Sequence, residues 1–72
     1  MVKVALDGRK LRQARKSRHL TQETLAERAE ISDRYLRSME SGKKDNPSLS
    51  VTIKLCSVLN IAVEELVITR AF

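Results

Sequence analysis

Apolar residues along this chain recur mostly at the three- and four-residue spacings of α-helices. Four of these periodic segments follow a residue whose side-chain oxygen accepts hydrogen bonds from the free N–H groups at a helix start. These residues are Asp7, Thr21, Ser32 and Ser48. Helices are therefore predicted over residues 7 to about 18, 21–29, 32 to about 41 and 48 to about 59, with a short fifth helix over residues 62–67. The expected fold is one all-α domain of five helices, residues 1–72.

The fourth predicted helix is apolar on two sides, so it is expected to be buried on both. One apolar stripe consists of Leu49, Ile53, Cys56 and Leu59, and the other of Val51, Leu55 and Val58. Gly42 is expected to end the third helix in a left-handed conformation, and Asn60 to end the fourth. The chain ends, residues 2–4 and 67–69, alternate weakly as strands do but are too short to assign.

Charge and cysteine content narrow the possible partners and compartments. The net charge of +5 suits a polyanionic partner without proving one, and residues 3–18 hold seven bases against the single acid Asp7. Cys56 is the only cysteine, so a disulfide within the chain is excluded and a reducing, cytoplasmic location is expected. Neither a secretion signal nor a membrane-spanning segment is expected. Cys56 itself is interpreted as a small buried apolar residue.

Catalytic chemistry has little support in the sequence. One histidine, His19, and one cysteine cannot together make a zinc site. The sequence also shows no nucleophile with a base, no paired acid and base, and no phosphate-binding loop. We therefore expect a protein that is not an enzyme, with no cofactor, no metal and no small-molecule ligand.

An ordered set of residues between about 6 and 66 resembles the helix-turn-helix family of phage repressors and Cro proteins, the XRE or Cro/CI type. The matching residues are Leu11, Arg15, Leu20-Thr21-Gln22, Leu25-Ala26, Ile31-Ser32, Leu36, Met39-Glu40, Gly42-Lys43, Asn46-Pro47-Ser48-Leu49, Leu55, Leu59-Asn60-Ile61 and Glu65-Leu66. The chain departs from the family at His19 and Glu30, where the family usually has glycine. Each must take a left-handed backbone or a different turn.

The resemblance implies a lambda-repressor-like domain whose helix-turn-helix spans about residues 21–41. The third helix is then expected in the DNA major groove, where arginine donates to guanine and aspartate accepts from cytosine. The expected base-reading residues are Asp33, Arg34, Arg37 and Ser38. An ordinary solvated helix face is the alternative interpretation.

Contacts to the DNA backbone are expected on both sides of this helix. The candidate residues are Gln22, Tyr35, Ser41, Lys43 and Lys44. In the resembling family the position of Gln22 bonds a phosphate, although a glutamine here also fits a role in the helix cap. Tyr35 is expected mainly to pack, with its hydroxyl near a phosphate as the alternative. Such contacts add affinity and salt dependence rather than sequence reading.

Two further features follow from the resemblance. Arg15 and Glu40 are expected to form a partly buried ion pair that ties the first helix to the third. A homodimer interface is expected at Val58, Ile61, Val63 and Leu66, with Val67, Ile68 and Phe72 extending it. The alternative is that these apolar residues only close the core of one chain.

The sequence is therefore interpreted as a bacterial or phage transcription regulator, similar to small Cro-like repressors and restriction–modification controller proteins. It is expected to read a palindromic operator in double-stranded DNA as a homodimer and to act as a repressor. Contact with RNA polymerase through Glu23, Glu27 and Glu30 is left open. The rival interpretation is a protein-interaction module, such as an antitoxin-like partner with secondary DNA binding.

Overall fold

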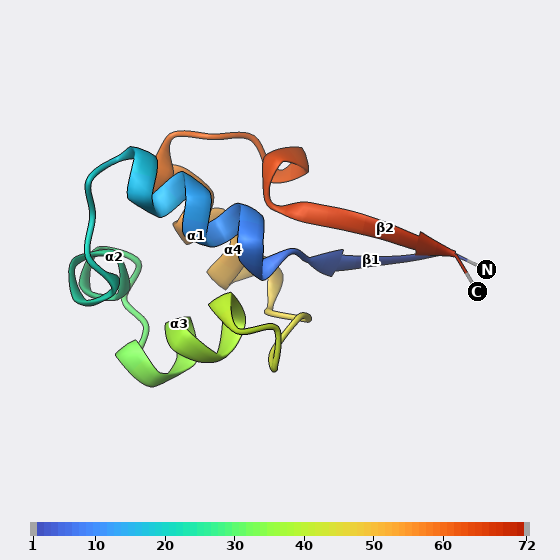
Figure 1. Ribbon diagram of the computed structural model, residues 1–72, viewed down its shortest axis with the longest axis horizontal. Helices are drawn as coiled ribbons and strands as arrows, with labels where there is room; N and C mark the ends of the chain where they lie inside the picture. Colours follow the sequence, from blue (N-terminus) through green and yellow to red (C-terminus); the bar gives the residue numbers. More distant parts are fainter. Residues whose placement is uncertain (1, 72) are drawn as a thin grey trace.

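Four α-helices form the body of the molecule, and a two-stranded hairpin extends from one side of it (Figure 1). The computed structural model describes the backbone of residues 2–71 and the side chains of residues 4–69. The elements in chain order are β1 (Val2–Leu6), α1 (Gly8–Ser17), α2 (Gln22–Arg28), α3 (Asp33–Glu40), α4 (Leu49–Leu59), the 3-10 turn η1 (Val63–Glu65) and β2 (Val67–Ala71). The hairpin makes the molecule elongated, with principal extents of 36 × 21 × 20 Å.

All four predicted helix caps are present, and they place each helix within a residue or two of its expected bounds. Asp7 accepts from the backbone N–H of Arg9 at 2.9 Å. Thr21, Ser32 and Ser48 each accept from the backbone N–H three residues later, at 3.0, 3.0 and 3.2 Å. These bonds satisfy N–H groups that have no partner inside the helix, which is why local sequence predicted the boundaries well.

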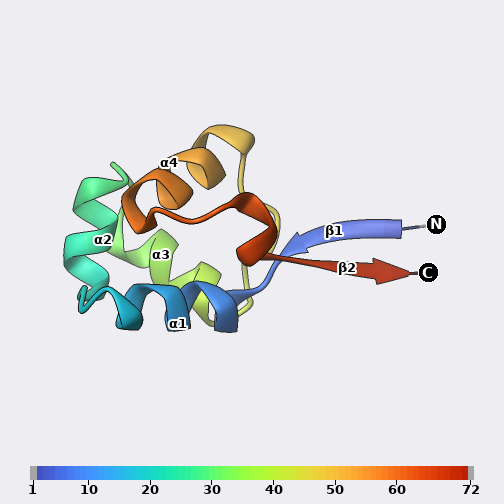
Figure 2. The same cartoon turned by 90° about the horizontal axis from the view of Figure 1, so that it is seen from above.

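The prediction of an all-α chain with five helices is wrong at its two ends. The expected fifth helix is only the three-residue turn η1, and the chain then extends as β2. β2 pairs antiparallel with β1, with Leu6 opposite Val67 and Val4 opposite Thr69 (Figure 2). The backbone N–H of Leu6 also donates to the Asp45 carbonyl at 2.8 Å, which fixes the base of the hairpin to the body. Strands this short are stabilised by pairing, so their own sequence signals them only weakly.

The core is built mainly from leucines of all four helices, together with Leu6 and Leu66 at the base of the hairpin. α4 is rotated relative to the prediction, so that Leu49 and Ile53 are exposed and Thr52 is buried. The Thr52 hydroxyl donates to the Ser48 carbonyl at 3.0 Å, so its burial leaves no unsatisfied polar group. The inner face of α4 is therefore Thr52, Leu55, Cys56 and Leu59, which has regular helical spacing.

The turns on either side of α2 take the left-handed backbone, which was one of the two conformations that the sequence left open. His19 has a φ of 57° and Glu30 a φ of 59°. In each case the next residue closes the turn, since Leu20 N donates to Arg15 O at 3.2 Å and Ile31 N donates to Ala26 O at 2.9 Å. This bonding pattern occupies carbonyl groups at the helix end, so the turn forms without the usual glycine.

Candidate nucleic-acid interface

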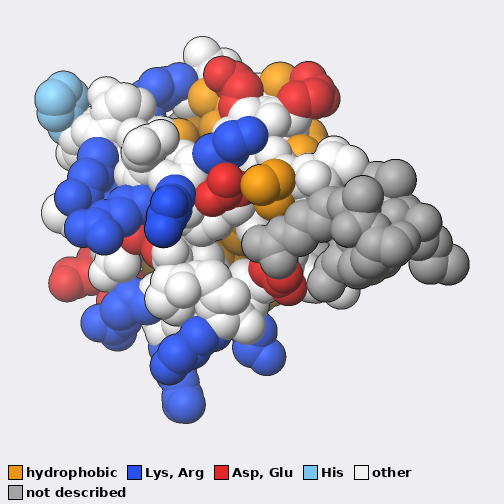
Figure 3. All heavy atoms as spheres, turned by 45° about the vertical axis from the view of Figure 1, so that its right-hand side comes forward, with side chains coloured by type: hydrophobic (Ala, Val, Ile, Leu, Met, Phe, Trp, Pro, Cys, Tyr) orange, Lys and Arg blue, Asp and Glu red, His pale blue; other side chains and the backbone are white. Residues whose placement is uncertain are grey.

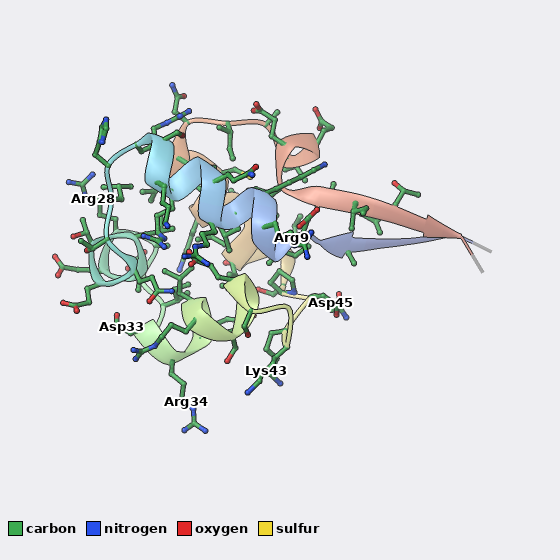
Figure 4. All side chains as sticks on the ribbon, viewed as in Figure 1. Arg9, Arg28, Asp33, Arg34, Lys43 and Asp45 are labelled. Atoms are coloured by element: carbon green, nitrogen blue, oxygen red, sulfur yellow. The ribbon has the colours of Figure 1, made fainter. Side chains whose placement is uncertain are left out.

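Helix α3 is anchored by one face and exposed on the other. Leu36 and Met39 are completely buried against the core. Arg34 and Arg37 are exposed, while Asp33 and Ser38 are partly buried. In Figure 4, Arg34 points away from the body below α3, and Asp33 lies at the N-terminal end of the helix. The four predicted base-reading residues therefore lie on a helix whose position is fixed by its apolar side.

The loop after α3 extends this polar surface. Gly42 has a φ of 87°, and its N–H donates to the Met39 carbonyl at 3.2 Å, which turns the chain sharply. The Ser41 hydroxyl and the Lys44 N–H both donate to the Ser38 carbonyl, each at 3.1 Å. Lys43 and Lys44 are exposed. Figure 3 shows Lys and Arg side chains projecting along the lower edge of the molecule, where α3 and this loop lie.

Glu40 joins three elements through its carboxylate. Arg15 of α1 donates from Nε to Oε2 at 2.7 Å and from Nη2 to Oε1 at 3.1 Å. The side chains of this pair are only 10% and 5% exposed. Gln22 of α2 donates from Nε2 to Oε1 of the same carboxylate at 3.0 Å. Arg15 also donates to the Leu20 carbonyl at 2.8 Å, so the network fixes α1, the turn before α2 and the start of α2 relative to α3.

Gln22 is more constrained than the sequence indicated, whereas Tyr35 packs as expected. The bond to Glu40 uses one N–H of the Gln22 amide, so the second N–H and the amide oxygen are the groups left for another ligand. Thr21, not Gln22, provides the cap of α2. Tyr35 is half-buried and its side chain packs against the core.

A hollow of about 610 Å³ lies between α1, α2 and α3 and brings part of the predicted site together. Its lining includes Gln22, Asp33, Arg37 and Ser41 together with the Arg15–Glu40 pair. Exposed Arg12 of α1 lines it as well and was not among the predicted site residues. Its only sequence signal was a position one helical turn before Arg15. Arg34, Ser38, Lys43 and Lys44 lie outside this hollow.

Some of the basic charge near the N-terminus has a structural role instead. Arg18 Nε donates to the Leu59 carbonyl at 2.8 Å, at the C-terminal end of α4. Positive groups are favourable there because the helix dipole leaves the last carbonyls partly negative. Lys10 Nζ donates to the Val67 carbonyl at 3.1 Å. The charge imbalance in residues 3–18 therefore overstates the basic surface available to a partner.

The predicted dimer residues are not all at the surface. Leu66 is completely buried in the core, so its place in an interface was wrong. Val58 and Ile61 are partly buried, Val63 and Ile68 are more exposed, and Phe72 lies outside the described residues. Leu66 is taken into the core because the chain turns at η1 and enters β2, where a longer fifth helix was expected.

The remaining chemical candidates have structural surroundings. His19 is exposed in the α1–α2 turn. Burial raises the pKa of the Cys56 thiol, and the nearby carboxylates Glu64 and Glu65 raise it further. Within the described part of the chain, acidic, His and Cys side chains do not gather in threes as a metal site would need. Among those residues, too, the helices are too short or too polar to cross a membrane.

Comparison with known proteins shows which family this arrangement of helices belongs to. A family model described as helix-turn-helix matches residues 11–66. This chain belongs to the XRE-type helix-turn-helix family.

Relatives of this helix-turn-helix protein include transcriptional regulators. It is 34% identical to the HTH-type transcriptional regulator SinR of Bacillus subtilis (strain 168) over 59 residues. These aligned residues cover 82% of this chain and 53% of SinR. The chain therefore spans about half the length of this relative. The restriction–modification controller protein C.AhdI from Aeromonas hydrophila is 36% identical, with a TM-score of 0.75 over 81% of this chain and 86% of that one.

A solved structure of SinR, described as the master regulator for biofilm formation, in complex with DNA is also similar to this helix-turn-helix protein. It is 33% identical, with a TM-score of 0.76 over 79% of this chain and 90% of that one. The family match begins inside α1 and ends at residue 66, so β1 and β2 lie outside it. The hairpin is therefore a feature of this chain beyond the segment that the family model describes.

Proposed function

We propose that this helix-turn-helix protein binds double-stranded DNA sequence-specifically and regulates transcription as a repressor. The observation that carries the proposal is the anchoring of α3, with Leu36 and Met39 fully buried and Arg34 and Arg37 exposed on the opposite side. A fixed helix with projecting arginines suits the major groove, which admits one α-helix. The similarity to SinR, a regulator solved in complex with DNA, supports the DNA-binding part of the proposal.

The proposed division of labour follows from exposure and position. Arg34 and Arg37 would donate paired hydrogen bonds to guanine edges, Asp33 would accept from cytosine, and Ser38 would bond a neighbouring base. These are short-range contacts and would specify the sequence.

The phosphate contacts come from either side of α3. Lys43 and Lys44 supply charge beside the Gly42 turn, and Ser41 lies at the start of the same loop. Gln22 would use its second amide N–H for a phosphate, while Glu40 holds the first. Tyr35 would contribute through its hydroxyl, since its ring packs against the core.

The proposed operator is a palindrome read by a homodimer. Two-fold operators with half-sites one helical turn apart match proteins with two-fold symmetry. Of the interface residues expected from the sequence, Val63 is exposed and remains a proposed contributor, whereas Val58 and Ile61 pack against the core. Contact of Glu23, Glu27 and Glu30, in and just after α2, with RNA polymerase remains a separate proposal, which would make the protein an activator at some promoters.

Replacing Arg34 with alanine tests the base-reading role. Arg34→Ala should weaken binding to the preferred duplex by about 1–3 kcal/mol and relax the preference at one base pair of each half-site. Arg28→Ala is the matched control, because Arg28 is also an exposed arginine but lies on α2, away from the lower face of α3 (Figure 4). Fluorescence-anisotropy titrations with matched and single-mismatch duplexes would measure both. Equal losses for the two variants would contradict the assignment.

Salt dependence separates a backbone contact from a base contact. Lys43→Ala should weaken binding to all duplexes by a similar factor and lower the slope of log affinity against log salt by about 1. A change in sequence preference without a change in slope would show that Lys43 reads bases instead.

A further inference from the structure

Exposed apolar side chains gather on one flank of the molecule, where the hairpin meets the start of α4. We call Val4, Leu49, Ile53 and Val63 the apolar flank; they are 59%, 73%, 53% and 37% exposed. Val4, Leu49 and Val63 line one hollow of about 250 Å³, and Ile53 lies one turn after Leu49 on α4. Leaving several large apolar side chains together in water is unfavourable, and such clusters mark interaction sites.

The apolar flank holds both a projection and a recess. Leu49 is the most exposed large apolar residue described and stands at the edge of the hollow that Val4 and Val63 help to form. A two-fold axis through this flank would place Leu49 of each copy in the hollow of the other. Such an interface uses the same surface twice, which is the requirement for a closed symmetric dimer.

We propose that a second copy of this chain covers the apolar flank, with Leu49 as the central contact. The inference rests on the proposed function in one respect, since a palindromic operator needs a two-fold pair of reading helices. The proposed interface differs from the one expected from the sequence, because Leu66 is buried in the core. Leu49 and Ile53, which were expected in the core, are exposed instead.

The charge distribution favours a second copy at this flank over other faces. The chain carries a net charge of +5, so two copies repel one another where basic side chains meet. Among the described residues that line the hollow, Asp45 is the only charged one. By contrast, the larger hollow beside α3 is lined by Arg12, Arg37 and other charged groups. The lining of this hollow therefore brings no basic side chains of two copies together.

The position of the flank is compatible with DNA binding by both copies. The hairpin extends to the side of the body, whereas Arg34 points down from α3 (Figures 1 and 4). A copy docked beside the base of the hairpin would leave the exposed arginines of both α3 helices uncovered. Val4 lies on the hairpin strand β1, which is outside the segment that the family model matches. The family model therefore does not describe this part of the proposed interface.

Leu49→Asp tests the proposal with little risk to the fold. The side chain is mostly exposed, and an acid in the first turn of a helix is favourable to its dipole. We expect sedimentation equilibrium to show a dimer for the wild-type chain and at least about 30-fold weaker association for Leu49→Asp, as for a central interface residue. Ser50→Asp is the matched control, because it adds the same charge to the same exposed helix turn beside the flank and should remain dimeric.

A charge-pair experiment tests the contact itself. Val63→Lys should also weaken the homodimer, and mixing it with Leu49→Asp should restore a dimer of one copy of each. In that mixed pair the new acid faces the new base at one of the two symmetric contacts, and the other contact is native. A mixture that stays monomeric, with both variants folded by circular dichroism, would overturn the reciprocal contact.

The outcomes separate this inference from the proposed function. An undiminished dimer for Leu49→Asp, a monomeric wild-type chain, or equal loss in Ser50→Asp would each overturn the inference. If the wild-type chain still selects one DNA sequence after any of these results, the proposed DNA binding stands. A wild-type dimer that depends on Leu49 but selects no DNA sequence would support the interface and contradict the proposed function.

Discussion

At the scale of single residues, Glu40 has more partners than sequence alone predicted. Its pairing with Arg15 followed from the family resemblance, but the hydrogen bond from Gln22 did not. Side-chain bonds between residues 18 positions apart depend on how three helices pack, and helical periodicity does not report this. Arg12, too, was recognisable only after α1, α2 and α3 were seen to share one hollow.

Removing the Glu40 carboxylate should destabilise the protein strongly. Glu40→Ala leaves the Arg15 guanidinium nearly buried without its counter-ion, and we expect a loss of roughly 3–5 kcal/mol in the free energy of unfolding. Glu23→Ala, an exposed acid in the first turn of α2, serves as the control and should change stability by less than about 1 kcal/mol. Urea denaturation followed by circular dichroism measures both, and an unchanged midpoint for Glu40→Ala would refute this role.

At the scale of elements, the sequence predicted what local signals determine. Asp7, Thr21 and Ser48 predicted helix starts correctly because a cap acts within three residues of itself. The strands escaped assignment because β1 and β2 are stabilised by each other from opposite ends of the chain. The rotation of α4 was also missed, because the prediction placed only apolar residues on the inner face. Thr52 can occupy that face because its hydroxyl bonds the Ser48 carbonyl.

Gly8 is an element-scale feature that no local pattern singled out. A Cβ atom at this position would overlap the carbonyl oxygens of Met39 and Glu40, because the start of α1 rests on the end of α3. Gly8→Ala should therefore force these helices apart and lower stability by several kcal/mol, at or above the roughly 1–3 kcal/mol typical of overpacking.

Gly42→Ala is the informative comparison for Gly8→Ala. A Cβ there meets open space, so only its left-handed backbone opposes the change, at a cost of about 1–2 kcal/mol. Thermal unfolding of both variants would rank them. A Gly8→Ala variant that is at least as stable as Gly42→Ala would contradict the close approach of α1 to α3.

At the scale of the whole molecule, the two exposed surfaces have different characters. The lower face carries arginines and lysines around α3, and the apolar flank carries Leu49 and its neighbours beside the hairpin. The first suits a polyanion and the second suits a neutral protein surface. Together they fit a small protein that binds DNA as a pair, with the fold of each copy holding its reading helix at a set distance from the shared flank.

The most direct test of this account is selection of bound duplexes from a random DNA library, repeated at two salt concentrations. The account predicts a palindromic consensus whose half-site centres lie about one helical turn, roughly 34 Å, apart, and which persists at the higher salt. Recovery of no consensus, with binding that disappears as salt rises for all duplexes alike, would mean that charge alone brings the protein to DNA. That result would contradict sequence-specific regulation and favour a protein-interaction role.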